Sequence, residues 1–329
     1  MRRVGLLLGI MLGMPVLAEA QTAGMPLALD VKIPLGAVSG RIDHLAVDLK
    51  RQRLYVAELG NDTIGVVNLA ARKMQSTMFG AKEPQGIAYE PSTDTVYVAH
   101  AGDGSVRVLR ADDLTLLQRI DLGDDADNVR IDVPRKRVLV GYGKGALAVI
   151  DPSSRKKVAD IRLKAHPESF QIDESGTRAF VNVPDAQQIQ VIDLVKGEAT
   201  GELPTKGYRS NFPMALDREK HRVLTVFRSP ARLLALAAGD GAVVADLDTC
   251  GDADDVFIDS KRHRVYVSCG AGLVDVFEES ADSYKRIGNV ATVPGARTSL
   301  FVPEQDLLYV AVRAAGPEPA AIWIFRPIP

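Results

Sequence analysis

The sequence predicts an all-β fold, a seven-bladed β-propeller built from four-stranded antiparallel blades. Three observations predict it: a short apolar strand recurs seven times, further strands follow each copy in a meander, and long helical periodicity is absent. The copies end at positions 48, 90, 132, 173, 217, 259 and 303, which are 42, 42, 41, 44, 42 and 44 residues apart. Regular four-stranded repeats of this length are typical of propeller blades.

The strands within a repeat follow from the hydrophobic pattern. In the first repeat, residues 44–48, 54–57 and 63–69 form the first three strands, separated by polar turns. The fourth strand alternates apolar and polar residues, as in residues 119–122 and 160–163. Blades pack against neighbours on both faces, which explains why the second strands are almost entirely apolar.

The two ends of the chain are expected to meet in one blade. The last repeat stops at residues 322–325, its third strand, and residues 29–35 have the pattern of the missing fourth strand. We therefore expect the N-terminal strand to close the last blade, which leaves no open sheet edge. An open solenoid of seven units is the alternative, and it would need polar capping repeats that are not evident.

The N-terminus has the features of a cleaved signal peptide over residues 1–20. Arg2 and Arg3 are followed by an apolar run over residues 4–14, and Ala-Glu-Ala at 18–20 fits a cleavage site. A single propeller domain would then occupy residues 21–329. No later segment is apolar enough to cross a bilayer, so we expect an exported, periplasmic protein without a membrane span.

Composition excludes several classes of protein. The 40 Lys and Arg against 42 Asp and Glu give a net charge of −2, so no global field marks a nucleic-acid or membrane binder. The absence of Cys-x-x-Cys-His excludes attached c-type haem. Cys250 and Cys269 both map to the same end of the sixth blade, and in an oxidising compartment this predicts a disulfide.

The second strands carry a family resemblance. Leu-Tyr-Val-Ala-Glu at 54–58, Val-Tyr-Val-Ala-His at 96–100 and Val-Tyr-Val-Ser-Cys at 265–269, with Gly-Asn-Asp-Thr-Ile-Gly-Val-Val-Asn-Leu at 60–69, resemble the YVTN family of propeller repeats. Within that family the chain is similar to the secreted bacterial YncE-like proteins, over essentially the whole mature chain. The resemblance implies a periplasmic seven-bladed propeller. It defines no reaction, and it adds nucleic acid as a partner to test.

Residues at the start of each first strand should line one end of the central channel. The expected ligand-binding residues are Asp43, His44, Gln85, Asn128, Glu168, Asn211, Asp254 and Arg297. Asp43, Glu168 and Asp254 are candidate ligands for a divalent cation such as Ca²⁺. His44 and His100 are candidate acid–base residues. The alternative is that these acids and amides cap turns and face solvent.

The opposite end of the propeller is expected to be basic. Its turns contain Lys and Arg at residues 50–53, 135–137, 218–222 and 261–264. Such a face could dock an anionic partner, although no aromatic residues alternate with the basic ones to stack bases. The alternative is that Lys and Arg simply suit exposed turns.

The sequence favours a monomeric binding protein without defined catalysis, which holds a small molecule or a protein partner at the acidic end of the channel. One alternative is a metal-dependent lactonase- or lyase-type propeller enzyme with a divalent metal in the channel. The other is an accessory protein that docks nucleic acid or an envelope polymer by its basic face. Gly-x-Ser-x-Gly, His-Glu-x-x-His and phosphate-binding Gly-Lys-Ser/Thr motifs are absent.

Overall fold

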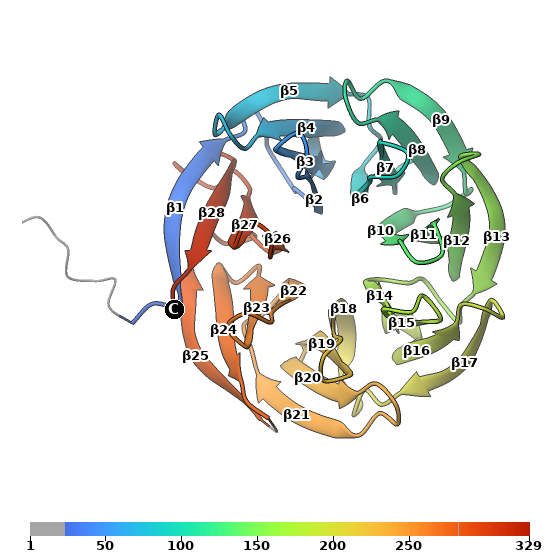
Figure 1. Ribbon diagram of the computed structural model, residues 1–329. Coiled ribbons are helices and arrows are strands. Elements are labelled where there is room, and N and C mark those ends of the chain that lie inside the picture. Colours follow the sequence, from blue (N-terminus) through green and yellow to red (C-terminus); the bar gives the residue numbers. More distant parts are fainter. Residues whose placement is uncertain (1–23, 282) are drawn as a thin grey trace, which may run out of the picture.

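The computed structural model describes residues 24–281 and 283–329. The chain forms a ring of seven four-stranded antiparallel sheets, with the first strand of each at the centre (Figure 1). Within the described residues, the helical elements are the short 3₁₀ segments η1 (Leu59–Asn61) and η2 (Pro184–Ala186). The predicted all-β, seven-bladed β-propeller is confirmed. The predicted signal peptide over residues 1–20 lies outside the described residues.

Every blade runs from an innermost strand to an outermost strand in chain order, except the last. The first three blades contain β2 (Leu45–Asp48), β3 (Arg53–Glu58), β4 (Thr63–Asn68) and β5 (Lys73–Phe79); β6 (Pro84–Glu90), β7 (Thr95–His100), β8 (Ser105–Arg110) and β9 (Leu116–Asp121); and β10 (Ala126–Asp132), β11 (Arg137–Tyr142), β12 (Ala146–Asp151) and β13 (Lys156–Arg162).

The next three blades repeat the same order. They contain β14 (Phe170–Ile172), β15 (Arg178–Val183), β16 (Gln188–Asp193) and β17 (Glu198–Leu203); β18 (Arg209–Asp217), β19 (Arg222–Ser229), β20 (Ala231–Ala237) and β21 (Val243–Asp248); and β22 (Ala253–Asp259), β23 (Arg264–Cys269), β24 (Leu273–Glu279) and β25 (Tyr284–Ala291).

The seventh blade joins the two ends of the chain. It consists of β26 (Thr298–Val302), β27 (Leu307–Val312), β28 (Ala321–Pro327) and, on the outside, β1 (Leu27–Pro34). β1 pairs antiparallel with β28, with Leu27 opposite Pro327 and Pro34 opposite Ala321. The predicted closure by the N-terminal strand is confirmed, and it pairs the outer edge of β28 along its length.

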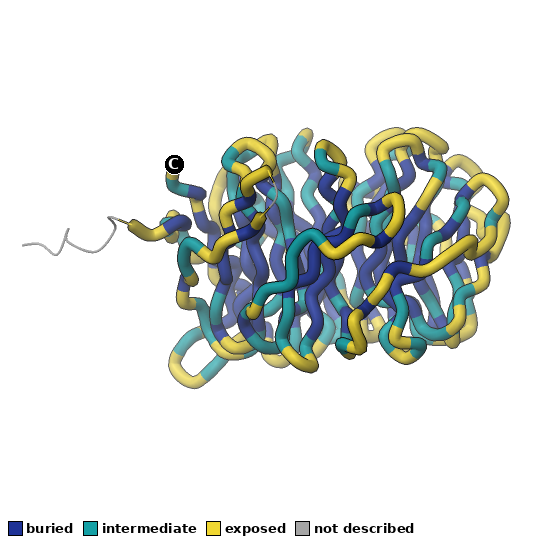
Figure 2. Tube along the Cα trace, turned by 90° about the horizontal axis from the view of Figure 1, so that it is seen from below, coloured by how far each residue is buried: buried dark blue, intermediate teal, exposed yellow. Residues whose placement is uncertain are grey.

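The hydrophobic core lies between neighbouring blades. The second strands supply its tyrosines: Tyr55, Tyr97, Tyr266 and Tyr309 are all at most 1% exposed. The outermost strands are mostly exposed, as are the turns at both rims of the ring (Figure 2). The Tyr-Val pairs of the repeat are therefore packing residues, which is why they predict the fold and say little about function.

An acid at the end of the first strand, present in every blade but the last, shapes the turn that follows it. The Asp48 carboxylate accepts a hydrogen bond from the backbone N–H of Arg51 at 3.0 Å, and Asp217 accepts one from Lys220 at 2.9 Å. Such side-chain bonds satisfy backbone donors in tight turns. The regularly spaced acids are thus structural. None of the described helices is long or apolar enough to span a membrane.

Candidate functional site

The residues at the mouth, the end of the channel where the innermost strands begin, are placed by β-bulges. The register of the innermost strand shifts between Pro84 and Ile87 in β6, Ala126 and Val129 in β10, Asn211 and Met214 in β18, and Ala253 and Asp255 in β22. A bulge breaks the strict alternation of side chains and redirects them locally. It lets neighbours such as Asp127 and Asn128 line the same space.

Two spaces lie at the centre of the ring. The first, which we call the mouth pocket, is lined by Arg41, Asp43, His44, Asp127, Asn128, Glu168, Ser169, Phe212 and Asp254. It leaves about 10 Å³ for a water-sized sphere, close to the room that a single water needs. The second is the channel, with about 360 Å³, to which all seven innermost strands contribute. His44 lines both spaces.

One side of the mouth, near blades five to seven, carries acids that are paired with arginines. We call it the paired half. Arg297 contacts Asp254 at 2.9 Å through Nε and Asp252 at 2.9 Å through Nη1. Arg228 also pairs with both carboxylates, at 3.3 Å from Asp252. Burial raises the pKa of Asp254, and the charges of Arg297 and Arg228 oppose this rise.

His44 bridges this half to the channel. Its Nε2 lies 3.7 Å from Asp43 Oδ1, and its Nδ1 lies 3.9 Å from Asp255 Oδ1. Asp43 is also paired with Arg41 at 2.8 Å. The pKa of Asp255 is raised well above its usual value by burial, against which the hydrogen bond from the Ser299 N–H acts. His44 therefore sits between two carboxylates, where it can orient a ligand or hold a proton.

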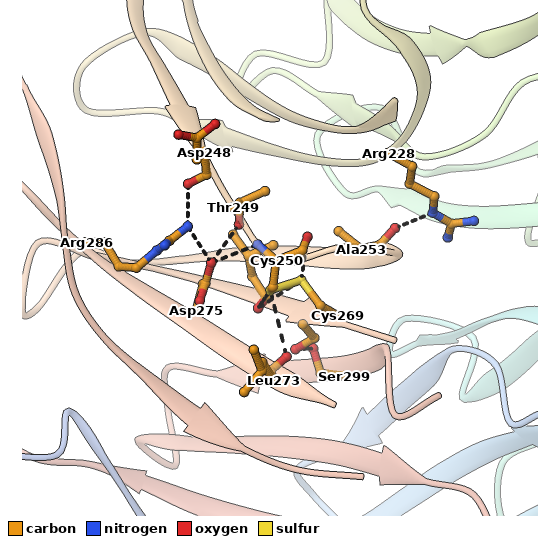
Figure 3. The surroundings of a disulfide bond; sticks show 12 residues. Arg228, Asp248, Thr249, Cys250, Ala253, Cys269, Leu273, Asp275, Arg286 and Ser299 are labelled. Carbon is orange, nitrogen blue, oxygen red and sulfur yellow. Dashed lines mark hydrogen bonds and ion pairs between the residues drawn. A yellow bond between two sulfur atoms is a disulfide. The ribbon is translucent and has the colours of Figure 1, made fainter. Parts of the chain in front are cut away.

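The predicted disulfide between Cys250 and Cys269 is confirmed, with the Cα atoms 5.9 Å apart. It anchors the loop that begins at Cys250 to Cys269 at the end of β23 (Figure 3). Asp252 and Asp254 follow Cys250 in the sequence. The Cys250 N–H donates to Asp275 at 2.8 Å, and Arg228 Nε donates to the Ala253 carbonyl at 2.8 Å. The paired half is thus held by covalent, ionic and hydrogen bonds together.

The other side of the mouth, at blades three and four, has acids without arginine partners. We call it the unpaired half, and it consists of Asp127, Asn128, His166 and Glu168. Asp127, His166 and Glu168 each offer a ligand atom, and these atoms lie within 4.8 Å of one another. Asp127 is only 6% exposed and Asn128 only 2%. A Cβ on Gly86 would lie 2.1 Å from the Asp127 carbonyl oxygen, so only glycine permits this close approach.

The pKa values of the two acids in the unpaired half are raised by burial, because neither carboxylate has an ion-pair partner. Burial raises the pKa of Asp127 to about 7; the charge of Asp43 adds to the rise, and His44 opposes it. The pKa of Glu168 is raised well above its usual value by burial and by the charges of Asp127 and Asp254, and the charge of Arg228 opposes this rise. Carboxylates perturbed in this way within a pocket are typical of functional sites, and a bound cation would relieve their repulsion.

The structure places the sequence-predicted site residues in different surroundings. Asp43, His44, Asn128, Glu168 and Asp254 line the mouth pocket. Gln85 donates to Asp125 at 3.2 Å, and Arg297 stands beside Asp254.

Asn211 and His100 lie away from the mouth pocket. Asn211 is fully buried and donates to Asn182 Oδ1 at 2.9 Å, within an amide network that joins blades four and five. His100 is fully buried at the end of β7, where burial, followed by the charge of Arg107, lowers its pKa to about 4.

Three residues of the site were not singled out from the sequence. Arg41 and His166 each lie two residues before an expected site residue, Asp43 and Glu168, in the same connecting loops. Arg130 faces the channel from β10 and donates to the Phe170 carbonyl at 3.1 Å. Extending the search two residues upstream of each first strand would have found the first two.

The expected basic face is largely neutralised. Arg262 pairs with Asp259 at 3.0 Å and with Asp306 at 2.5 Å, and Arg137 pairs with Asp132 at 2.7 Å. Acids of the same turns or of neighbouring blades thus balance the Lys and Arg. This reduces the field that the opposite face can offer an anionic partner.

Comparisons with known proteins identify the fold alone. The sequence matches no protein-family model and no curated protein. Among solved structures, the chain is similar to hydrazine synthase of Kuenenia stuttgartiensis, with a TM-score of 0.74 and 16% identity over 83% of this chain and 95% of that chain. It is also similar to a chain of a mitotic checkpoint complex, with a TM-score of 0.74 and 13% identity over 98% of both chains. At these sequence identities, the similarity shows a shared fold and does not indicate a shared activity.

Proposed function

We propose that this protein is an exported, YncE-like propeller that binds a positively charged ligand at the mouth pocket and acts by binding rather than by catalysis. The observation that carries the proposal is the contrast within the mouth. Asp252 and Asp254 are paired with arginines, whereas Asp127 and Glu168 make no ion pair or side-chain hydrogen bond with any described residue. Burying a carboxylate without a partner costs free energy, and a cationic ligand would offset that cost.

Export is supported by independent features. Residues 1–20 have the pattern of a cleaved signal peptide, and a disulfide fits an oxidising compartment. The YncE-like assignment is supported by the Tyr-Val strands of the repeat and by a propeller of seven blades.

The proposal is tested on protein recovered from the periplasmic fraction of a Gram-negative host. We expect N-terminal sequencing to begin at Gln21 and native mass spectrometry to show a bound species. The double variant Asp127→Asn/Glu168→Gln should lose that species because it removes both uncompensated charges. The matched control is Glu174→Gln/Glu219→Gln, which removes two exposed carboxylates from the opposite end and should retain the species.

Two outcomes contradict the proposal. If the protein stays in spheroplasts with its first residues attached, it is not exported. If wild-type protein carries no bound species, or if the mouth variant carries the same one, the mouth pocket is not the binding site.

A further inference from the structure

We propose that Asp127, His166 and Glu168 bind a divalent transition-metal ion, with Zn²⁺ as the preferred ion, at the junction of blades three and four. This rests on the proposed function, since it identifies the cation that the mouth would bind. The three side chains come from the start of β10 and from the loop entering β14, and their ligand atoms lie within 4.8 Å of one another. Zn²⁺ bonds to nitrogen and oxygen are ~2.0–2.2 Å long, so the three side chains would draw closer together around a bound ion.

Two buried polar groups point to a missing partner. Asp127 is 6% exposed, and among the described residues its carboxylate has neither a hydrogen bond nor an ion pair. The Oδ1 atom of Asn128 is fully buried and also lacks a hydrogen-bond partner, and it belongs to the same mouth pocket. A metal ion, or a water bound to it, would give both groups a partner.

The orientation of His166 suits a metal ligand. Its Nδ1 lies 2.6 Å from the Gly143 carbonyl oxygen. A carbonyl can only accept, so Nδ1 carries the hydrogen and donates it. In the neutral imidazole the lone pair is then on Nε2, which makes no hydrogen bond with a described residue and lies 3.9 Å from Asp125 Oδ2. Metal-binding histidines characteristically donate their second N–H to a backbone carbonyl or carboxylate in this way.

The donor set and the available space select the ion. Ca²⁺ takes oxygen ligands, whereas one imidazole with two carboxylates suits Zn²⁺ and similar transition metals. The mouth pocket, which Asp127 and Glu168 line and His166 adjoins through its ligand atom, has room for about one water-sized sphere, about 10 Å³, which matches an ion and not an organic amine. The structure thus favours a nitrogen-containing site over the expected oxygen-only Ca²⁺ site of Asp43, Glu168 and Asp254.

The test is calorimetric titration of the full mature protein with Zn²⁺ and, separately, Ca²⁺, after removal of bound metal with a chelator. We expect about one Zn²⁺ per chain, bound at least ~10-fold more tightly than Ca²⁺. His166→Gln and Glu168→Gln should each weaken Zn²⁺ binding by at least ~10-fold. The matched control is His221→Gln, which removes an exposed histidine from the opposite end and should bind as wild type does.

A second measurement guards against variants that merely misfold. Co²⁺ bound to wild-type protein should give visible absorption bands that His166→Gln loses, while circular dichroism of the two proteins stays the same. Wild-type protein that binds no Zn²⁺, or His166→Gln that binds it unchanged, overturns the metal site. If an organic species is nevertheless found at the mouth by native mass spectrometry, the proposed binding function stands and only the metal assignment fails.

Discussion

The two halves of the mouth are built from equivalent positions of the repeat, but their buried acids differ in whether arginines neutralise them. In the paired half, Arg228 and Arg297 neutralise Asp252 and Asp254, and a disulfide fixes the loop. In the unpaired half, Asp127 and Glu168 form no ion pair with a described residue, and His44 and Arg228 act on them only through their charges, without direct contact.

The difference shows where a ligand is needed. Internal pairing makes the paired half complete without an occupant, and its rigidity holds the rim in place. The unpaired half is complete only when a cation supplies the missing charge. A function that depends on binding should therefore be sensitive to blades three and four, and stability should be sensitive to blades five to seven.

The largest expected effect comes from removing the arginines. Arg228→Met/Arg297→Met leaves Asp254 buried with only the more distant Arg41, 3.9 Å away, and we expect the free energy of unfolding to fall by about 3–5 kcal/mol. The matched variant in the unpaired half, Asp127→Asn/Glu168→Gln, removes unpaired charges. In metal-free buffer it should be neutral or stabilising. Urea unfolding followed by circular dichroism measures both.

A rescue experiment checks the cause of the loss. Adding Asp254→Asn to the arginine variant removes the stranded charge and should restore part of the stability. If both double variants destabilise equally, the distinction between the halves is wrong.

The disulfide has the next largest expected effect. Cys250→Ser/Cys269→Ser opens a loop of 19 residues, and the chain-entropy model gives a loss of ~3 kcal/mol. Thermal unfolding under non-reducing conditions measures it, and reducing agent should lower the melting temperature of wild type but not of the variant. Zn²⁺ affinity should change less than twofold, because the metal ligands lie in other blades. A large drop in affinity would show that the two halves are coupled.

The sequence predicts a structural feature well when the residues that form it lie close together in the chain. The blades follow from strand patterns and from acids such as Asp48 that cap their own turns, so they can be read from single repeats. The disulfide follows from two cysteines at adjacent strand ends. The pairing of Arg297 with Asp254 depends on how long side chains cross between blades, and this cannot be read from spacing.

The orientation of the side chains at the mouth could not be predicted from the sequence either. The β-bulges turn Asp127 and Asn128 into the pocket, while Asn211 turns towards Asn182 between two blades. Whether a polar side chain at a strand start faces the channel depends on backbone geometry that the hydrophobic pattern does not encode. The position of His166 could be found from the sequence, but its orientation could not, because that depends on the Gly143 carbonyl from another loop.

His100 extends the comparison to a buried titratable group that lines neither the mouth pocket nor the channel. Its pKa is lowered to about 4 by burial, below the usual value of 6.5. Between these values the unfolded chain binds more protons than the folded protein, so stability falls as the pH falls through 6.5 towards 4. From pH 7 to pH 5, this group alone should lower the free energy of unfolding by about 2 kcal/mol.

The measurement is the difference in pH dependence between wild type and His100→Gln. Other groups, including the mouth carboxylates, titrate in both proteins, so subtraction isolates His100. We expect the variant to be less stable at pH 7, where the lost packing dominates, and to lose less stability on acidification. Parallel pH profiles would mean that His100 is protonated in the folded state or reaches water. The conclusion that its ring is buried within blade two would then be wrong.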